Sequence, residues 1–279
     1  MDTQQVGTWA GLKLTRPLVM GILNVTPDSF SDGGHHASPD TAIAAGQRML
    51  AEGADILDIG GESTRPGALP VEPADEIARI LPVVQALAAT GAVISLDTRN
   101  ARTMAAGLDA GARIVNDISA LTHDPAALPL VVSRACPIVL MHMRGTPQTM
   151  NDHAVYNDIV TDVTAELASL CGRALAAGVK RHNICLDPGF GFAKRGDQNT
   201  ALLRGLTCLT RLGYPVLAAL SRKRFLGELS SETDAARRDP ESLAAGLYAL
   251  ARGAHILRVH DVGGTVRALR VWQRLTEEM

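Results

Sequence analysis

Short runs of apolar residues recur along the chain and are separated by segments with a helical pattern. Eight runs stand out, at 18–25, 55–60, 92–97, 113–117, 137–143, 183–187, 215–220 and 256–259. Most of them are continuously hydrophobic, which is typical of parallel strands that are buried on both faces. The pattern therefore predicts eight strands, each followed by a helix.

The helical segments can be located from their apolar spacing and from their ends. The clearest stripe recurs in steps of three or four: Val155, Ile159, Val163, Leu167, Leu170 and Ala174. That spacing places these side chains on one face of a helix, which we expect to cover the sheet. A capping residue, a proline and an acid follow one another at 38–40 and at 239–241, which predicts two helix starts. Left-handed C-caps are expected at Gly53, Gly111 and Gly178.

The number of repeats and the chain length favour an α/β fold, a single (β/α)8 TIM barrel. Such a barrel needs about 250 residues, and the chain has 279. No low-complexity linker divides the sequence, so we expect one barrel domain over 1–279, with 1–16 as a short N-terminal extension. A doubly wound open sheet is the alternative, because counting strands does not prove that the sheet closes.

Composition and charge narrow the classes of partner. Hydrophobic residues make up 46% of the chain but aromatic residues only 3%, so the core must consist mainly of Ala, Val, Ile and Leu. The 27 basic and 29 acidic side chains leave a net charge of −2, which argues against nucleic acid or an anionic membrane as a partner. The cysteines form no CxxC pair and the N-terminus has no signal-peptide pattern, so we expect a cytoplasmic protein with reduced thiols.

Polar residues follow the predicted strands on their C-terminal side. In a barrel these strand ends converge on one rim, where catalytic groups collect. The residues are Asn24, Asp97, Asn116, Asp117, Asp187, Ser221, Lys223, Arg258 and His260. Two carboxylates and a carboxamide, those of Asp97, Asp187 and Asn116, supply acceptors and a donor. Such a set suits a flat heterocycle that presents several N–H groups and a carbonyl.

Simpler interpretations apply to several polar side chains. Asp58 lies in the middle of a predicted strand, where we expect a satisfied interior residue and not a catalyst. Asn116 and Asp117 are neighbours on a strand and face opposite ways, so only one of them can point at a ligand. A lone histidine such as His142 or His260 is ordinarily a hydrogen-bonded structural residue.

Two kinds of segment add cations and aromatic rings at the strand ends. The basic residues of STRPG (63–67) and SRKRFLG (221–227) suit a phosphate or a carboxylate, although a basic triplet is usually a solvated surface. Phe190 and Phe192 are two of only four phenylalanines, and both lie in the glycine-rich loop DPGFGF, which favours ring contacts in a pocket. No GxxxxGKS or strand-borne GxGxxG motif occurs, so nucleotide cradles of those kinds are not indicated.

Eight motifs occur in the order found in one known family: GILNVTPDSFSDGG, DIGGESTRPGA, SLDTR, VNDIS, LMHMRGTP, LDPGFGF, SRKRFLG and RVHDV. From about Gly21 to the C-terminus the chain resembles dihydropteroate synthase. The resemblance implies a TIM barrel, usually a homodimer, in folate biosynthesis. It also implies that 6-hydroxymethyl-7,8-dihydropterin diphosphate is joined to 4-aminobenzoate with release of pyrophosphate. Mg²⁺ is then the expected metal, and sulfonamides are the expected inhibitors.

The same resemblance implies roles for individual residues. The pterin would be held by Asp97, Asn116, Asp187 and Lys223, and the diphosphate by Arg258 and His260. Asn24 would bind Mg²⁺, and Ser221 would contact the aminobenzoate carboxylate beside Lys223 and Phe190. The expected catalytic residues are Asp97, Lys223, Arg258 and His260. The other expected substrate-binding residues are Thr64, Arg65 and Pro66 in a second loop, Met141, and Gly191.

The mechanism that the resemblance implies needs no protein nucleophile. The C–O bond ionises, an ionised Asp97 favours the resulting pterin cation, and the arylamine attacks that cation. Two loops keep the site dry, and the first of them carries Phe30. One departure is visible, since Ala219 and Leu220 precede SRK where the family more often has a glycine. Two other functions remain alternatives, a folate-binding barrel of a corrinoid methyltransferase and a catalytically silent pterin-binding paralogue.

Overall fold

Eight parallel strands form the centre of the molecule. The computed structural model describes residues 7–26, 39–63 and 71–276. The strands are β3 (Leu18–Asn24), β4 (Ile56–Gly60), β5 (Ile94–Asp97), β6 (Ile114–Asp117), β7 (Ile138–Met141), β8 (Ile184–Asp187), β9 (Leu217–Ala218) and β10 (Ile256–Val259). Each falls within a predicted run, so the sequence pattern is confirmed strand by strand.

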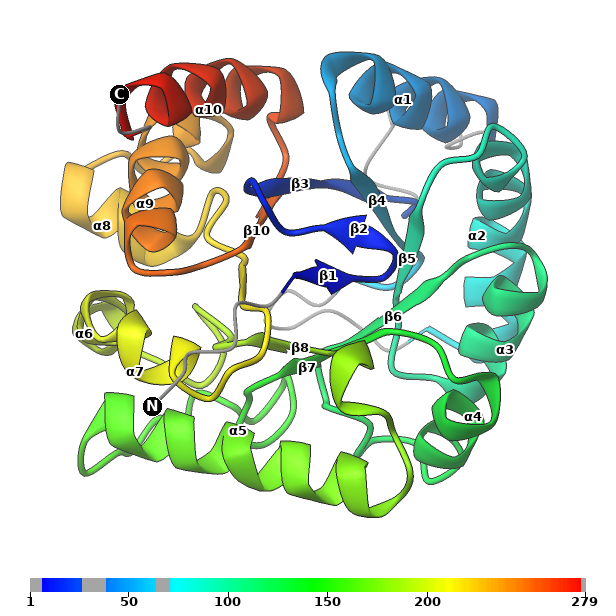
Figure 1. Cartoon of the computed structure of the whole chain (residues 1–279), viewed down its shortest axis with the longest axis horizontal. Helices are drawn as coiled ribbons and strands as arrows, with labels where there is room; N and C mark the ends of the chain where they lie inside the picture. Colours follow the sequence, from blue (N-terminus) through cyan, green and yellow to red (C-terminus); the bar gives the residue numbers. More distant parts are fainter. Residues whose placement is uncertain (1–6, 27–38, 64–70, 277–279) are drawn as a thin grey trace.

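The sheet closes into a barrel. Its hydrogen-bonded order is β8-β7-β6-β5-β4-β3-β10-β9, and the two end strands are joined by a parallel bridge between Leu186 and Val216. The alternative of an open sheet is therefore wrong. Helices surround the strands (Figure 1). They are α1 (Pro39–Glu52), α2 (Pro73–Ala88), α3 (Ala101–Asp109), α4 (Ala127–Arg134), α5 (Ile159–Ala176), α6 (Gly196–Arg204), α7 (Leu206–Thr210), α8 (Arg224–Ser230), α9 (Asp239–Ala251) and α10 (Val262–Thr276), with 3-10 turns η1 (Arg181–Asn183) and η2 (Ala235–Arg237).

Within the described residues the helix predictions hold with two corrections, whereas the predicted cap Ser38 lies outside the described ranges. Most of the stripe at 155–174 faces the barrel on α5, but Val155 precedes the helix and is 70% exposed. Asp239 is not a cap, because the N-cap of α9 is Arg238 and the Asp239 carboxylate instead accepts hydrogen bonds from Arg222. The three predicted cap glycines do have left-handed φ angles, between +105° and +108°. None of the described helices is long and apolar enough to cross a membrane.

The barrel interior changes from apolar to polar along the strands. Trp9, from the hairpin of β1 (Thr8–Trp9) and β2 (Leu12–Lys13), packs with Ile56, Ile114 and Ile256 in one buried cluster at the strand beginnings. The indole N–H of Trp9 donates to the Asn183 carbonyl at 3.1 Å. Residues two positions further along a strand face the same way. The same interior therefore receives polar side chains near the strand ends, namely Asp58, Asn116 and Arg258.

Candidate active site

A contact between β6 and β4, which lie on either side of β5, shows which residue of the Asn116–Asp117 pair faces the interior. Asn116 points inward, where its Nδ2 donates to Asp58 Oδ2 at 3.0 Å. Asp117 points to the other face and accepts hydrogen bonds from the backbone and hydroxyl of Ser119, both at 2.7 Å, and from Leu121 N–H. Asp117 therefore stabilises the turn after β6, and Asn116 is the candidate for ligand contact.

A half-buried arginine joins two carboxylates inside the barrel. Arg258 donates from Nε to Asp58 Oδ2 at 2.6 Å and from Nη2 to Asp97 Oδ2 at 2.5 Å. Burial lowers the pKa of Arg258, but the two carboxylates outweigh that effect and leave it raised. Burial raises the pKa of Asp97 to about 7, with Arg258 opposing and Asp58 adding to the rise. The structure therefore directs Arg258 inward, whereas the sequence assigns it to the diphosphate.

Asp58 is an interior residue, as expected, but only one of its oxygens is satisfied. Oδ2 receives both Asn116 and Arg258, while Oδ1 has no hydrogen-bond partner in the described part of the chain. The side chain is 1% exposed. Sequence analysis missed its function as the anchor of Arg258. The available signal was a carboxylate two positions after Ile56, on the face that lines the barrel.

Only one cation of the SRKR segment faces the site. Arg222, in a left-handed conformation with φ of +57°, turns its guanidinium to Asp239, and exposed Arg224 pairs with Glu228. Lys223 instead lies with Nζ 4.3 Å from the Phe192 ring centre. Burial lowers the pKa of Lys223 to about 8, and the Asp187 and Asp97 charges oppose this. Among the described residues, no hydrogen bond or ion pair occupies the Lys223 ammonium, so apart from its contact with the Phe192 ring it has N–H groups available for a ligand.

The loop after β8 approaches Lys223 through glycine. Gly191 has φ of +78°, and a Cβ there would lie 3.2 Å from Lys223 Cδ. Gly189 donates its N–H to Asp187 Oδ1 at 2.7 Å. Burial raises the pKa of Asp187, and this hydrogen bond and Lys223 oppose the rise. Glycine thus allows the backbone to contact both charged groups.

The two phenylalanines of this loop have different surroundings. Phe190 is fully buried and stacks on Phe225 with ring centres 6.4 Å apart. Phe192 is half-buried beside Lys223. Pocket-lining by Phe190 stays a prediction, and Phe192 is the ring that contacts a predicted site residue. Met141, at the end of β7, is 3% exposed.

Ser221 and His260 form a hydrogen-bonded pair at the ends of β9 and β10. Ser221 Oγ accepts the His260 backbone N–H at 3.1 Å and lies 2.9 Å from His260 Nδ1. Burial and the neighbouring Arg222 and Arg258 charges lower the pKa of His260 to about 3, so the ring is neutral at pH 7. With the Ser221 hydroxyl donating to Nδ1, the proton of the neutral ring resides on Nε2, which is then a donor.

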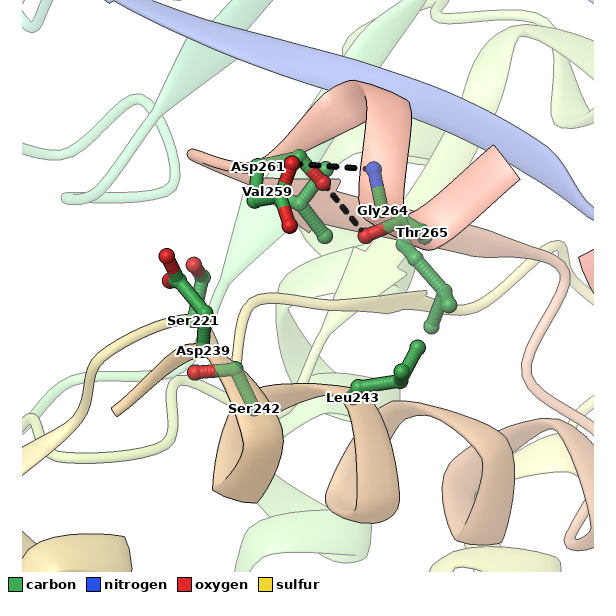
Figure 2. Close-up of a pocket in the computed structure, with 9 residues that line it drawn as sticks. Ser221, Asp239, Ser242, Leu243, Val259, Asp261, Gly264 and Thr265 are labelled. Carbon is green, nitrogen blue, oxygen red and sulfur yellow. Dashed lines mark hydrogen bonds between the residues drawn. The ribbon is translucent and has the colours of Figure 1, made fainter. Parts of the chain in front are cut away.

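Behind Ser221 lies a small cavity of about 20 Å³, between α9, β10 and α10 (Figure 2). It is lined by Ser221, Asp239, Ser242, Leu243, Leu257, Val259, Asp261, Gly264 and Thr265. This volume accommodates about one water molecule. It is therefore too small for either expected substrate, and Ser221 forms the boundary between it and the predicted site.

Replacing Ser221 by Ala should raise the KM for 4-aminobenzoate about tenfold, because the single Ser221 O–H can turn from His260 Nδ1 to the substrate carboxylate, and a hydrogen bond to a charged group contributes about 1.5–3 kcal/mol. Pterin affinity should change little. Steady-state kinetics and calorimetry measure the two effects, with exposed Ser133→Ala as the control. An equal loss of pterin affinity would show that Ser221 does not act on aminobenzoate.

Several predicted residues lie outside the described ranges. Thr64, Arg65 and Pro66 belong to the stretch 64–70, and Phe30 to 27–38, so their predicted roles are not addressed by the structure. Asn24, at the end of β3, is half-buried, and its carboxamide makes no hydrogen bond with a described residue. Within the described ranges, no group of three His, Cys, Asp or Glu side chains could hold a metal.

Comparisons with known proteins show the family to which the chain belongs. The profile of the family described as pterin binding enzyme matches residues 20–260. A dihydropteroate synthase of Neisseria meningitidis serogroup C is 47% identical over 266 residues, which cover 94% of each chain. The structure of Xanthomonas albilineans dihydropteroate synthase with 4-aminobenzoic acid superimposes with a TM-score of 0.91, at 47% identity and 97% coverage of both chains. The same organism's enzyme in complex with 7,8-dihydropteroate gives a TM-score of 0.88, at 44% identity, covering 96% of this chain and 97% of that one. This chain therefore belongs to the pterin-binding enzymes and, within them, to the dihydropteroate synthase family.

Proposed function

We propose that the protein condenses 6-hydroxymethyl-7,8-dihydropterin diphosphate with 4-aminobenzoate to give 7,8-dihydropteroate and pyrophosphate. The observation that carries the proposal is the set of buried groups at the strand ends of one barrel. Asp97, Asn116 and Asp187 are each less than 10% exposed, and Lys223 interacts electrostatically with both aspartates. Acceptors and donors of this kind match the N–H groups and the carbonyl of a pterin.

The residues also suit the charge changes of a dissociative reaction. As the C–O bond breaks, positive charge develops on the pterin, and the Asp97 carboxylate stabilises it at close range. Negative charge develops on the leaving diphosphate, toward which Arg258 and the Nε2–H of His260 can donate. Asp58 holds Nε of Arg258, so only the Nη2 contact with Asp97 has to be exchanged when the substrates bind.

Mg²⁺ fits the donor set at Asn24. A carboxamide oxygen without a hydrogen-bond partner in the described part of the chain is a suitable hard ligand, and Mg²⁺ ordinarily takes one or two protein ligands together with substrate phosphates and water. Bound there, the ion would neutralise charge on the departing diphosphate. We therefore include Mg²⁺ in the proposal, with Asn24 as its protein ligand.

Changing Asn24 to Ala should weaken binding of the pterin diphosphate in the presence of Mg²⁺ by about 10–100-fold or more, since losing a residue that only supports a metal ligand already costs a factor of that size. Binding of the bare pterin alcohol should stay within about twofold, because that ligand carries no phosphate for the ion. Calorimetry on both ligands, with and without Mg²⁺, separates the cases. Equal losses for the two ligands would remove Asn24 from the metal site.

The proposed reaction is tested by measuring pyrophosphate release from the pterin diphosphate with and without 4-aminobenzoate. Release that requires 4-aminobenzoate and accompanies dihydropteroate formation supports the proposal. Pterin binding without any release would support the silent paralogue instead. Methyl transfer from a methylated folate to a corrinoid would support the methyltransferase alternative.

We also propose that the protein is a cytoplasmic homodimer that sulfonamides inhibit in competition with 4-aminobenzoate. All four cysteines are free thiols, which agrees with a reducing compartment. Light scattering of the purified protein tests the dimer, and sulfonamide inhibition at varied 4-aminobenzoate tests the competition.

A further inference from the structure

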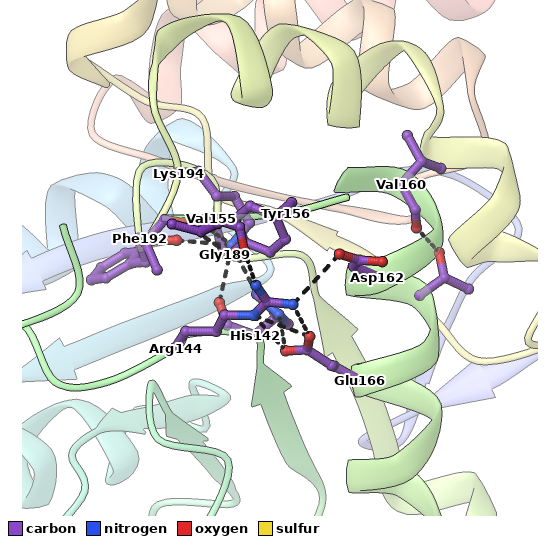
Figure 3. Close-up of polar contacts among 12 residues, drawn as sticks. His142, Arg144, Val155, Tyr156, Val160, Asp162, Glu166, Gly189, Phe192 and Lys194 are labelled. Atoms are coloured by element: carbon purple, nitrogen blue, oxygen red, sulfur yellow. Dashed lines mark hydrogen bonds and ion pairs between the residues drawn. The ribbon is translucent and has the colours of Figure 1, made fainter. Parts of the chain in front are cut away.

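A buried lysine lies between the end of β7 and the loop after β8, outside the set of residues assigned to substrates. Lys194 is 7% exposed. Its Nζ lies 2.9 Å from His142 Nδ1, 2.9 Å from the Phe192 carbonyl, 3.0 Å from the Gly189 carbonyl and 3.3 Å from the His142 carbonyl (Figure 3). An ammonium has three N–H donors, so these acceptors use all of them.

A neutral histidine links this ammonium to a carboxylate. Because His142 Nδ1 accepts from Lys194, its Nε2 carries the ring proton and donates to Glu166 Oε2 at 2.9 Å. Burial and the Lys194 charge lower the pKa of His142 to about 4, which agrees with a neutral ring. Arg144 donates from Nε to the same carboxylate at 3.0 Å and lies 4.0 Å over the Tyr156 ring. The charged groups on either side of neutral His142 therefore alternate in sign, since Lys194 is positive, Glu166 is negative and Arg144 is positive.

The loop held by Lys194 is the loop that contacts the substrate residues. The carbonyl of Phe192 accepts from Lys194, while the ring of the same residue lies beneath the Lys223 ammonium. The carbonyl of Gly189 accepts from Lys194, while its N–H donates to Asp187. The backbone at Gly189 also fits closely, because a Cβ there would lie 2.0 Å from the His142 carbonyl oxygen. Each of these two loop residues thus connects Lys194 to a charged group of the site.

We propose that Lys194 is a positioning residue, whose ammonium fixes Gly189 and Phe192 and thereby places the Asp187 carboxylate and the Lys223 ammonium. His142 and Glu166 orient Lys194 from the opposite side. Four charged groups in the described part of the chain face Lys194. Asp187 and Lys223 belong to the site, and Glu166 and Arg144 lie on the far side of His142. The inference rests on the proposed function, because it concerns how that same site is arranged.

Lys194→Met, which fills the space without donating, should lower kcat/KM by about 10–100-fold, since small displacements of positioned groups have effects of this size. Most of the loss should lie in KM for the pterin substrate. The midpoint of urea unfolding and the circular dichroism spectrum should show a folded protein. Exposed Lys180→Met is the matched control. Glu166→Gln, which keeps the shape of the outer partner and removes its charge, should give a smaller loss in the same direction.

Chemical rescue distinguishes positioning from general stability. Lys194→Ala lacks three carbons and the ammonium, which together correspond to propylammonium. Propylammonium chloride should restore part of the lost pterin affinity, measured by calorimetry, whereas tetramethylammonium chloride at the same ionic strength should not. Wild-type kinetic constants in a folded Lys194→Met protein, or failure of propylammonium to restore affinity in folded Lys194→Ala, would overturn the inference. If the wild type releases no pyrophosphate, the proposed function fails, and the calorimetry still tests Lys194.

Discussion

Asp97→Asn should lower kcat/KM by about 10²–10⁴-fold, because the carboxylate is expected to make two charge-assisted hydrogen bonds to the pterin, each contributing about 1.5–3 kcal/mol. It would also remove the negative charge that stabilises the developing pterin cation. The amide keeps the size of the side chain, so the loss reports chemistry and not a cavity. Steady-state kinetics measures it, with exposed Asp109→Asn as the control.

The same substitution should alter how stability depends on pH. Burial raises the pKa of Asp97 to about 7 from 3.8, so the folded protein keeps this proton at pH values where the unfolded chain has lost it. The carboxyl therefore stabilises the fold most below about pH 4, and this contribution is lost as the pH rises through 7. As the pH rises from 5 to 8, the free energy of unfolding of Asp97→Asn should therefore increase relative to that of the wild type. Urea unfolding measures the free energy of unfolding of both proteins at pH 5 and at pH 8. If the difference between the two proteins is the same at both pH values, the raised pKa of Asp97 is contradicted.

Lys223→Met should reduce affinity for the pterin diphosphate by about 10–100-fold, since it removes a charged donor worth about 1.5–3 kcal/mol and leaves two carboxylates with less compensating charge. Because burial lowers the pKa of Lys223 to about 8, wild-type affinity should fall as the pH rises through 8, and the variant should lack that fall. The loss should be larger at pH 7 than at pH 5, where protonation of the aspartates relieves their repulsion.

Calorimetry across pH 5 to 9 measures the Lys223 effect, with exposed Lys180→Met as the control. Lys223→Arg should restore little affinity, because a planar guanidinium needs more room than the close approach of Gly191 and the Phe192 ring allows. Wild-type affinity in both variants would show that the ammonium does not contact the pterin. A fall above pH 8 that persists in Lys223→Met would assign the titration to another group.

The strands could be predicted because each is a continuous apolar run, and strands buried on both faces leave that pattern in the sequence. The inward position of Asn116 follows from the same alternation once Ile114 is placed in the barrel interior. The partners of Arg258 could not be predicted, because Asp58 and Asp97 approach it only when β10 pairs with β3, the first strand of the barrel. Closure depends on long-range pairing that no local pattern encodes.

Lys194 escaped prediction for a related reason. Its sequence neighbours are a glycine-rich loop and a helix start, which are typical of an exposed lysine. Its acceptors come from β7, from the β8 loop and, through His142, from α5. Only the packing of these three elements makes the side chain a buried donor. The burial of Phe190 could not be predicted for the same reason, since its partner Phe225 lies on another element, α8.

The closure of the barrel has a consequence for how the chain folds during synthesis. Leu18 at the start of β3 pairs with Ile256, and Trp9 donates to Asn183, so these segments lack their partners until a much later part of the chain has been synthesised. At about 5–20 residues per second, translation of the intervening chain takes on the order of 10–50 seconds. During that time one edge of β3 has no partner strand, and the indole of Trp9 lacks the Asn183 carbonyl. The nascent chain therefore presents an apolar strand edge for aggregation or for chaperone binding until β10 leaves the ribosome.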